Sequence, residues 1–326
     1  MRSVFYSYTL RYSAIPRALL LTLFLLLLIP AVFADDGEIS FLVLGDWGRD
    51  GEYHQSDVAS TMGIVADSMG ADFVISTGDN FYSNGVSSVD DSQWMSSFEM
   101  VYTAPSLNIP WYAVLGNHDY RGNWKAQIDY SETSSRWRMP APYYTVKYQL
   151  GDSTSVQLFF LDTNPFPLCY NLNPLTWRLW FKGTKKQMRW FEESLAASDA
   201  VWKIVVAHHG LYSTGARHGN TGSLKKKVEP LLEKYGVQAY FNGHDHSLQH
   251  QDPERNHVQF FTSGAGSDLH DMDEDTGETR FAQSIQGFMA ARLTPDTLHI
   301  QIIDYQGNLL YSTAVGRDGN VMENQH

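Results

Sequence analysis

The sequence predicts an α/β fold in which two β-sheets pack face to face with helices on their outer sides. Short apolar runs typical of strands alternate with helix-like segments, which is the pattern of layered α/β proteins. Many of these runs are apolar at almost every position, as expected for strands that are buried on both faces. The strands outnumber the helices, and this surplus favours two sheets.

The elements follow one another with no internal repeat and no low-complexity linker after the N-terminal segment. The predicted strands are Ile39–Leu44, Phe73–Ser76, Trp111–Leu115, Tyr143–Leu150, Val156–Leu161, Trp202–Ala207, Val237–Phe241, Val258–Thr262, Gly287–Leu293 and Leu298–Ile303. The predicted helices are Asp57–Ser68, Gln93–Tyr102, Lys185–Ala197 and Ser223–Lys234. We therefore expect residues 35–326 to form a single domain.

Residues 1–34 have the layout of a secretory signal peptide. Three arginines and no acidic residue precede an apolar stretch over residues 18–33, which is followed by the small residue Ala34. We expect cleavage after Ala34, and hence a secreted, periplasmic or lumenal protein without stable membrane insertion. The alternative is an uncleaved N-terminal anchor, because Leu20–Leu28 is strongly apolar, although the run is short for a membrane span.

The chain is acidic. Its formal net charge is −12, and removal of the three arginines in residues 1–34 would change this to −15. Such a chain is not expected to bind nucleic acid through a broad basic surface. The single Cys169 cannot form an internal disulfide and is expected to be an unpaired thiol or to pair with another chain. It lies in the long connection Asn164–Lys182, which is expected to be either a lid or mobile filler.

Five short motifs place an acid, an amide or a histidine at the ends of predicted strands. They are Gly45-Asp46-Trp47-Gly48, Gly78-Asp79-Asn80-Phe81-Tyr82, Gly116-Asn117-His118-Asp119, Ala207-His208-His209 and Gly243-His244-Asp245-His246. Open α/β sheets form their ligand sites at the carboxyl ends of their strands. We therefore expect the motifs to meet at one site.

The side chains of these motifs form a ligand set for two metal ions. Two-metal hydrolases hold their ions roughly 3.5–4 Å apart, commonly with a shared ligand. Asp79 is the best candidate for this shared ligand, because a carboxylate can give one oxygen to each ion. The other candidates are Asp46, Asn117, His208, His244 and His246. Each residue alone also fits an ordinary structural role, and only the set as a whole favours metal binding.

The motif series resembles that of the metallophosphoesterase superfamily. Tyr82, three residues after Asp79, makes the chain similar to the purple acid phosphatases, especially the small tartrate-resistant type 5 group. The resemblance extends over about residues 38–305. It implies a four-layer α/β/β/α sandwich of two packed mixed sheets. The chain departs from the mammalian members in its long loop, where they carry a disulfide pair and Cys169 stands alone.

The resemblance also implies two unequal metal sites. Fe(III) would be held by Asp46, Asp79, Tyr82 and His246, and a divalent Fe, Zn or Mn ion by Asp79, Asn117, His208 and His244. Hard phenolate and carboxylate oxygens suit Fe(III), while a mixed nitrogen and oxygen set suits a borderline divalent ion. The alternative for Tyr82 is a packed aromatic residue beside Phe81.

Two histidines are expected to face the substrate. The resemblance implies that His118 binds phosphate or protonates the leaving group, with Asp119 orienting its imidazole. A purely structural histidine is the alternative. The family has a second such histidine about nine residues after the ligand at His208, whereas His218 lies ten residues after it. We expect His218 to take this role, with His209 as the alternative.

These residues predict a secreted acid phosphatase that hydrolyses phosphate monoesters through water activated by the two ions. Small phosphomonoesters are the expected substrates, and phosphoproteins and nucleotides are further candidates. One alternative is a neutral phosphodiesterase or nucleotidase with two divalent ions, which would share every ligand except Tyr82. Another is a non-catalytic protein that sequesters phosphate or metal. The sequence does not predict the oligomeric state.

Overall fold

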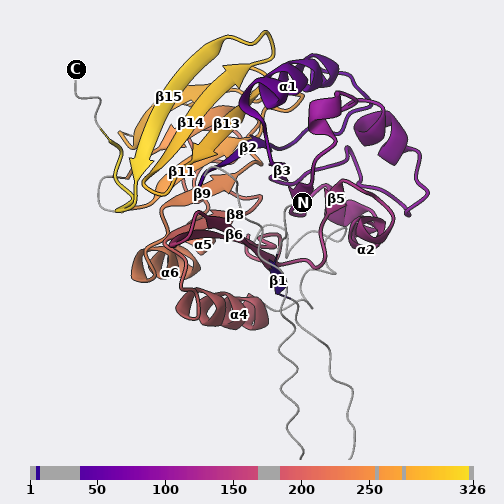
Figure 1. Cartoon of the computed structure of the whole chain (residues 1–326). Coiled ribbons are helices and arrows are strands. Elements are labelled where there is room, and N and C mark those ends of the chain that lie inside the picture. Colours follow the sequence, from indigo (N-terminus) through magenta and orange to yellow (C-terminus); the bar gives the residue numbers. More distant parts are fainter. Residues whose placement is uncertain (1–4, 8–36, 168–183, 254–256, 274–276, 323–326) are drawn as a thin grey trace, which may run out of the picture.

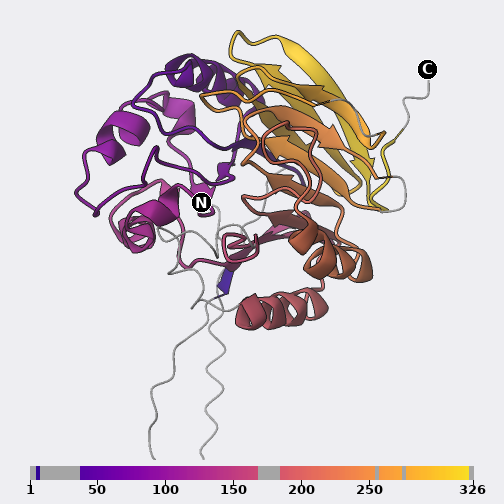
Figure 2. The same cartoon turned by 180° about the vertical axis from the view of Figure 1, so that it is seen from behind.

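The computed structural model describes residues 5–7, 37–167, 184–253, 257–273 and 277–322. Two mixed β-sheets pack face to face, and helices lie on their outer sides (Figure 1). Helix α1 (Gln55–Met69) lies on one outer side, and α4 (Thr184–Ala196), α5 (Gly222–Lys227) and α6 (Glu229–Lys234) lie on the other. The view from behind shows the same order of layers (Figure 2). The predicted four-layer sandwich is confirmed.

The first sheet has seven strands in the order β15-β14-β13-β2-β3-β4-β5. They are β2 (Ile39–Leu44), β3 (Phe73–Ser76), β4 (Trp111–Ala113), β5 (Trp137–Arg138), β13 (Gly287–Leu293), β14 (Thr297–Asp304) and β15 (Leu309–Gly316). Strands β2 to β5 are parallel to one another, whereas β13 to β15 pair in antiparallel fashion. The carboxyl ends of β2, β3 and β4 therefore lie at one edge, where the first three motifs begin.

The second sheet has eight strands in the order β1-β6-β7-β8-β9-β11-β10-β12. They are β1 (Phe5–Ser7), β6 (Tyr144–Leu150), β7 (Thr154–Phe160), β8 (Trp202–Val206), β9 (Ala239–Asn242), β10 (Leu248–Gln251), β11 (Gln259–Ser263) and β12 (Thr279–Gln283). Strands β7, β8, β9 and β11 are parallel. The last two motifs follow β8 and β9, at the same edge of this sheet.

Most of the predicted signal peptide lies outside the described residues. Phe5–Ser7 is the described part, and it pairs with Thr145–Lys147 of β6. Cleavage after Ala34 would remove this strand and leave β6 at the edge of the sheet. Among the described residues, no helix has the length and apolar character needed to cross a membrane. Cys169 and residues 168–182 of the predicted loop also lie outside the described residues.

Two predicted helices differ from those in the structure. The segment predicted as Gln93–Tyr102 forms only a short π-helix, η1 (Trp94–Glu99). The segment predicted as Ser223–Lys234 is divided into α5 and α6 near Pro230, which has no N–H to donate within a helix. The remaining described helices are short: α2 (Trp124–Asp129), η2 (Pro105–Leu107), η3 (Asp119–Arg121) and η4 (Tyr130–Glu132).

A buried aromatic cluster supports the loops after β2 and β3. Trp47 of the first motif lies 5.4 Å from Phe81 of the second motif and 6.2 Å from Trp111 of β4, measured between ring centroids. The indole N–H of Trp47 donates to Ser76 Oγ over 2.9 Å. Buried aromatic rings contribute large apolar contact areas. The aromatic residues inside the motifs therefore fix the neighbouring acids in position.

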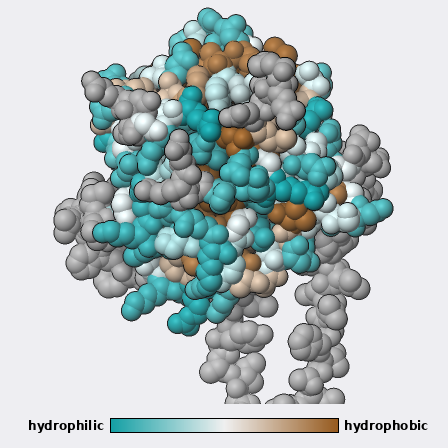
Figure 3. Space-filling model, turned by 90° about the vertical axis from the view of Figure 1, so that its left-hand side faces the viewer, coloured by the Kyte–Doolittle hydropathy of each residue, from teal (hydrophilic) through white to brown (hydrophobic). Residues whose placement is uncertain are grey.

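The surface of the protein is mostly hydrophilic on the face shown in Figure 3, with small apolar patches. A groove of about 880 Å³ lies between α1 and the strands β13 to β15. Ile64 and Met322, which line it, are exposed. No residue of the strand-end motifs lines this groove, so it is separate from the candidate site.

Candidate metal centre

The structure brings all the predicted metal ligands together at the carboxyl ends of parallel strands from both sheets. The first sheet supplies Asp46, Asp79, Tyr82 and Asn117, and the second supplies His208, His244 and His246. Each of these side chains is less than 9% exposed. Buried polar groups require partners, so the contacts within this set determine what it can hold.

The hydroxyl of Tyr82 lies at the centre of the first cluster. It is 2.9 Å from Asp46 Oδ1, 3.1 Å from Asp79 Oδ2 and 2.9 Å from His246 Nε2. A tyrosine hydroxyl has one hydrogen and can donate it to only one of these three atoms at a time. A cation at the centre of the four groups would satisfy all of them. The donor set therefore fits a metal ion.

The second cluster is centred on His208. Its Nδ1 lies 2.9 Å from the carbonyl oxygen of Thr77 and must carry the hydrogen, because a carbonyl only accepts. Its Nε2 faces Asn117 Oδ1 at 3.3 Å, His244 Nδ1 at 3.2 Å and Asp79 Oδ2 at 3.5 Å. Without a metal ion, burial lowers the pKa of His208, but the charge of Asp79 raises it to about 9. This cluster would therefore release a proton when it binds a metal ion.

Asp79 is shared between the two clusters through one oxygen. The sequence analysis predicts that each carboxylate oxygen faces a different ion. Instead, Oδ2 faces both Tyr82 and His208, while Oδ1 accepts the backbone N–H of His118 over 2.7 Å. Burial raises the pKa of this carboxyl, but the charge of His208 and the hydrogen bonds outweigh it, so the pKa lies well below its usual range. Asp79 is therefore ionised, which is the form that could bind a metal ion.

Unusual backbone conformations aim the ligands at the centre. Asp46, Asp79 and His244 have φ angles of 60°, 48° and 71°, in the left-handed region that residues other than glycine rarely adopt. Such strain is typical of functional sites. Neighbouring glycines leave the necessary space, because a Cβ on Gly116 would lie 2.1 Å from Asp79 Oδ1 and one on Gly243 would lie 2.3 Å from Asp46 Oδ2.

His118 lies beside the cluster rather than within it. Its Nδ1 is 2.7 Å from the carbonyl oxygen of Ser83, and its Nε2 is 3.9 Å from Asp79 Oδ2. Its side chain keeps 21% of its surface exposed, more than the ligand side chains of the two clusters. Burial lowers the pKa of His118, partly offset by the charge of Asp79. This position suits a group that contacts a substrate.

The prediction that Asp119 orients the imidazole of His118 is wrong. Asp119 begins η3, where the chain turns its carboxylate inward. The carboxylate accepts the backbone N–H of Gly116 at 2.8 Å, the backbone N–H of Asn80 at 3.1 Å and the side-chain N–H of Gln127 at 2.7 Å. Asp119 therefore joins the loops after β3 and β4.

The two candidates for the second substrate-facing histidine differ in exposure. The ring of His218 is exposed and stacks on His244, with 3.8 Å between centroids and 28° between planes. His209 is 1% exposed, and its Nδ1 lies 2.9 Å from Thr163 Oγ1. The geometry favours His218, because only a side chain at the surface of the cluster can reach a substrate.

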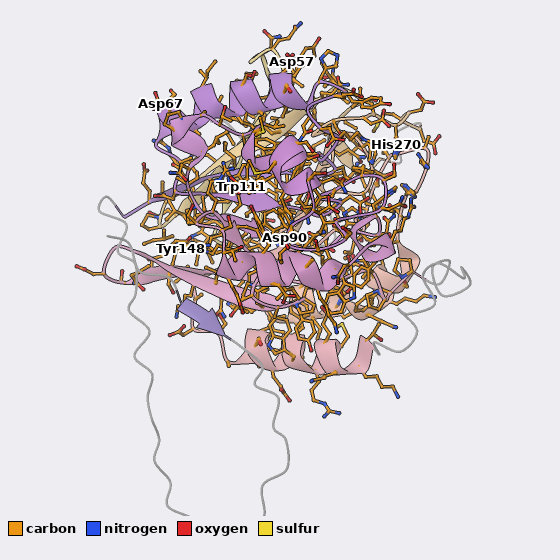
Figure 4. All side chains as sticks on the ribbon, turned by 90° about the vertical axis from the view of Figure 1, so that its right-hand side faces the viewer. Asp57, Asp67, Asp90, Trp111, Tyr148 and His270 are labelled. Atoms are coloured by element: carbon orange, nitrogen blue, oxygen red, sulfur yellow. The ribbon has the colours of Figure 1, made fainter. Side chains whose placement is uncertain are left out.

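Sequence reasoning missed Arg49, Arg217 and His270. The guanidinium of Arg49 lies 3.9 Å above the ring centroid of Tyr82, and the ring of His270 stacks on His246 at 3.7 Å and 8°. Figure 4 labels His270, which lies at the periphery of the molecule. For His270, the available signal was a glycine-containing turn after the predicted strand Val258–Thr262, which adds another strand end to the site.

A two-sheet α/β sandwich with this donor set at its strand ends defines a dinuclear metallophosphoesterase. Residues 39–248 match the model of the calcineurin-like phosphoesterase family, which is a family of phosphoester hydrolases. The chain is 42% identical to purple acid phosphatase 17 of Arabidopsis thaliana, over 85% of this chain and 84% of that protein. It is 36% identical to tartrate-resistant acid phosphatase type 5 of Oryctolagus cuniculus, over 90% and 96%. The chain belongs to the purple acid phosphatase family.

Solved structures agree on the fold. GAP50, the anchor in the inner membrane complex of Plasmodium, has a TM-score of 0.74 and 23% identity, over 88% of this chain and 90% of that one. Purple acid phosphatase PPD1 from seeds of Lupinus luteus has a TM-score of 0.64 and 19% identity, over 86% and 54%. At this level of identity, the likeness shows the fold alone.

Proposed function

We propose that the chain is a secreted acid phosphatase that hydrolyses small phosphate monoesters. We further propose an Fe(III) ion at Asp46, Asp79, Tyr82 and His246, and a divalent Fe, Zn or Mn ion at Asp79, Asn117, His208 and His244. The observation that carries the proposal is the hydroxyl of Tyr82, which lies within 3.1 Å of the carboxylates of Asp46 and Asp79. The proposal of secretion depends on the sequence of residues 1–34.

The surroundings of Tyr82 favour a trivalent ion. Burial is the largest cause that raises the pKa of Tyr82 well above its usual value, and the charges of Asp46 and Asp79 raise it further. A phenolate can form here only beside a strongly charged cation, which reverses these effects. Phenolate and carboxylate oxygens are hard ligands that suit Fe(III).

The ions and the side chains of the protein would have different roles in the reaction. When bound, the ions would supply charge stabilisation for the phosphate oxygens and activation of water. The Ser83 carbonyl holds the Nδ1 hydrogen of His118 and leaves Nε2 on the side of the metal centre. His118 would bind the phosphate or give a proton from Nε2 to the leaving oxygen. His218, above His244, would make the second contact with the phosphate.

Metal analysis and a visible spectrum of protein purified without added metal test the proposal. We expect iron in the protein and a purple or pink absorption band that disappears in Tyr82→Phe. Tyr235→Phe, at the carboxyl end of α6, is the matched control and should keep the band. We also expect hydrolysis of phenyl phosphate between about pH 4 and 7, because a trivalent ion would acidify water more than a divalent ion does.

Several outcomes would reject the proposal. A colourless protein with two divalent ions, whose activity is unchanged in Tyr82→Phe, would favour the neutral phosphodiesterase or nucleotidase. An iron-loaded protein that hydrolyses no aryl phosphate would favour a binding role. N-terminal sequencing of the exported protein tests secretion separately, because cleavage after Ala34 leaves Asp35 as the first residue.

A further inference from the structure

A second layer of histidine rings covers the metal-binding imidazoles. His218 stacks on His244 at 3.8 Å, and His270 stacks on His246 at 3.7 Å. The centroids of the two outer rings are 5.7 Å apart. His244 and His246 are buried, whereas His218 is exposed and His270 is half-buried. The outer rings therefore form the surface that an approaching substrate meets beside the metal centre.

Arg217 extends this surface with a positive charge. Its Nη1 lies 2.8 Å from His270 Nε2, so the guanidinium donates to the imidazole and is held in place by it. A guanidinium has five N–H donors. Apart from its contact with His270, the guanidinium of Arg217 forms no hydrogen bond with the described residues. Within the described part of the chain, Arg217 forms no ion pair with a carboxylate. Its charge is therefore available to a ligand.

Arg49 supplies a second guanidinium on the side of Tyr82. Its Nε donates to Ser267 Oγ over 3.2 Å, and its Nη2 lies 3.4 Å from Asp268 Oδ2. These contacts fix Arg49 against the turn that also carries His270. The same turn therefore places His270, and with it the guanidinium of Arg217, on the side of the centre where Arg49 lies.

We propose that Arg217 and Arg49 form a subsite for a second phosphate group of the substrate, next to the phosphate held at the metal centre. The inference rests on the proposed function and deepens it. The substrate class is a small molecule with two phosphate esters on one short carbon skeleton. Guanidinium groups match phosphate oxygens with paired N–H donors. Because Arg217 adjoins His218 in the sequence, one loop contacts both phosphates.

The test compares propane-1,3-diol bisphosphate with propane-1,3-diol monophosphate as substrates. We expect the wild type to have the higher kcat/KM for the bisphosphate. Arg217→Gln should lower the ratio of the two kcat/KM values about fivefold, since an exposed charge pair contributes about 1 kcal/mol. Added salt should reduce the ratio in the wild type more than in this variant. The matched control is Arg317→Gln, an exposed arginine paired with Asp296, and should leave both substrates unaffected.

Binding measurements separate this inference from the proposed function. The probes are propane-1,3-bisphosphonate and propylphosphonate, titrated by calorimetry into metal-loaded wild type and Arg217→Gln. A wild type without turnover, in which Arg217→Gln selectively weakens bisphosphonate binding, would support the subsite and reject the phosphatase. Turnover of both substrates with a ratio that Arg217→Gln leaves unchanged would overturn the subsite and leave the phosphatase. Equal binding of both probes by the wild type would also overturn the subsite.

Discussion

Gly116 shows how a residue without a side chain sets the position of a ligand. It follows β4 and precedes Asn117, and a Cβ at this position would lie 2.1 Å from Asp79 Oδ1 and 2.2 Å from the backbone nitrogen of Asp79. Asp79 also has a φ of 48°, so its backbone has little freedom to move away. The glycine is therefore required by the carboxylate that both clusters share.

We predict that Gly116→Ala displaces Asp79 and lowers metal affinity by about 10- to 100-fold, the range typical when a support of a metal ligand is changed. Equilibrium dialysis with the metal ion measures the change. Gly222→Ala is the matched control, because a Cβ on Gly222 meets no atom within 4 Å. Wild-type metal content in Gly116→Ala would show that the carboxylate is not held as described.

Individual residues also show what the sequence could not predict. The candidate ligands were found because each follows a strand, and parallel strands bring their carboxyl ends together. Asp119 was misjudged because neighbours in sequence need not be neighbours in space, and η3 turns its carboxylate towards Gly116 and Gln127. Arg217 and His270 were missed because 53 positions separate them, and the bridge between Gly215 and Met272 that brings their loops together has no signature in the sequence.

At the scale of elements, the strands that the sequence analysis does not predict are β1, β5, β10, β12 and β15, and β10 shows most clearly why patterning fails. All four of its residues, Leu248–Gln251, are buried, although three are polar. Strand prediction depends on apolar runs or on alternation, and β10 has neither. Its polar side chains are satisfied instead by specific partners: Gln249 accepts the backbone N–H of Thr214 at 2.9 Å, and His250 contacts Tyr311 and Gln259.

The hydrogen bonds of His250 fit its neutral form, with the hydrogen on Nε2. The side-chain N–H of Gln259 donates to Asp252 and to the Gly319 carbonyl, so Gln259 Oε1 accepts from His250 Nε2 over 2.9 Å. His250 Nδ1 then accepts the hydroxyl of Tyr311 over 2.9 Å. Burial lowers the pKa of His250 to about 4, with opposing effects from the Gln259 bond and the charge of Asp252, and a further lowering by Arg280.

We predict that His250 makes the protein less stable as the pH falls from about 6.5 to about 4. Because the pKa is depressed in the folded state, the unfolded chain takes up the proton first, and the free energy of unfolding decreases by at most about 3 kcal/mol. His250→Phe should be less stable at pH 7 but should lose less stability over this range. Urea unfolding at several pH values measures both.

The control for this prediction is an exposed histidine. His299 of β14 is exposed, and His299→Gln should keep the wild-type dependence of stability on pH. The two variants are compared in the slope of the free energy of unfolding against pH. The difference between these two slopes isolates the contribution of His250. Identical slopes in the wild type and in His250→Phe would mean that His250 takes up its proton as easily in the folded protein as in the unfolded chain.

At the scale of the whole molecule, the metal centre joins the two sheets. The first sheet contributes the candidate oxygen ligands Asp46, Asp79, Tyr82 and Asn117, and the second contributes the candidate imidazole ligands His208, His244 and His246. Alternating strands and helices predicted both sheets and the layers outside them. They could not predict how the sheets are joined, because that depends on contacts between residues such as Asp46 and His244, which are 198 positions apart.

We predict that removal of the ions destabilises both sheets together. An ion at 1,000 times its dissociation constant contributes about 4 kcal/mol to the folded state. A domain of this size changes its Tm by about 2–4 °C for each kcal/mol, so treatment with a reductant and a chelator should lower the Tm by about 10 °C. Differential scanning calorimetry measures the shift, and added iron should reverse it.

His246→Ala removes one ligand and should show a smaller shift on chelation. A single transition in both forms indicates that the sheets unfold as one unit, whereas a Tm unchanged by chelation would mean that the sheets pack without help from the metal ions.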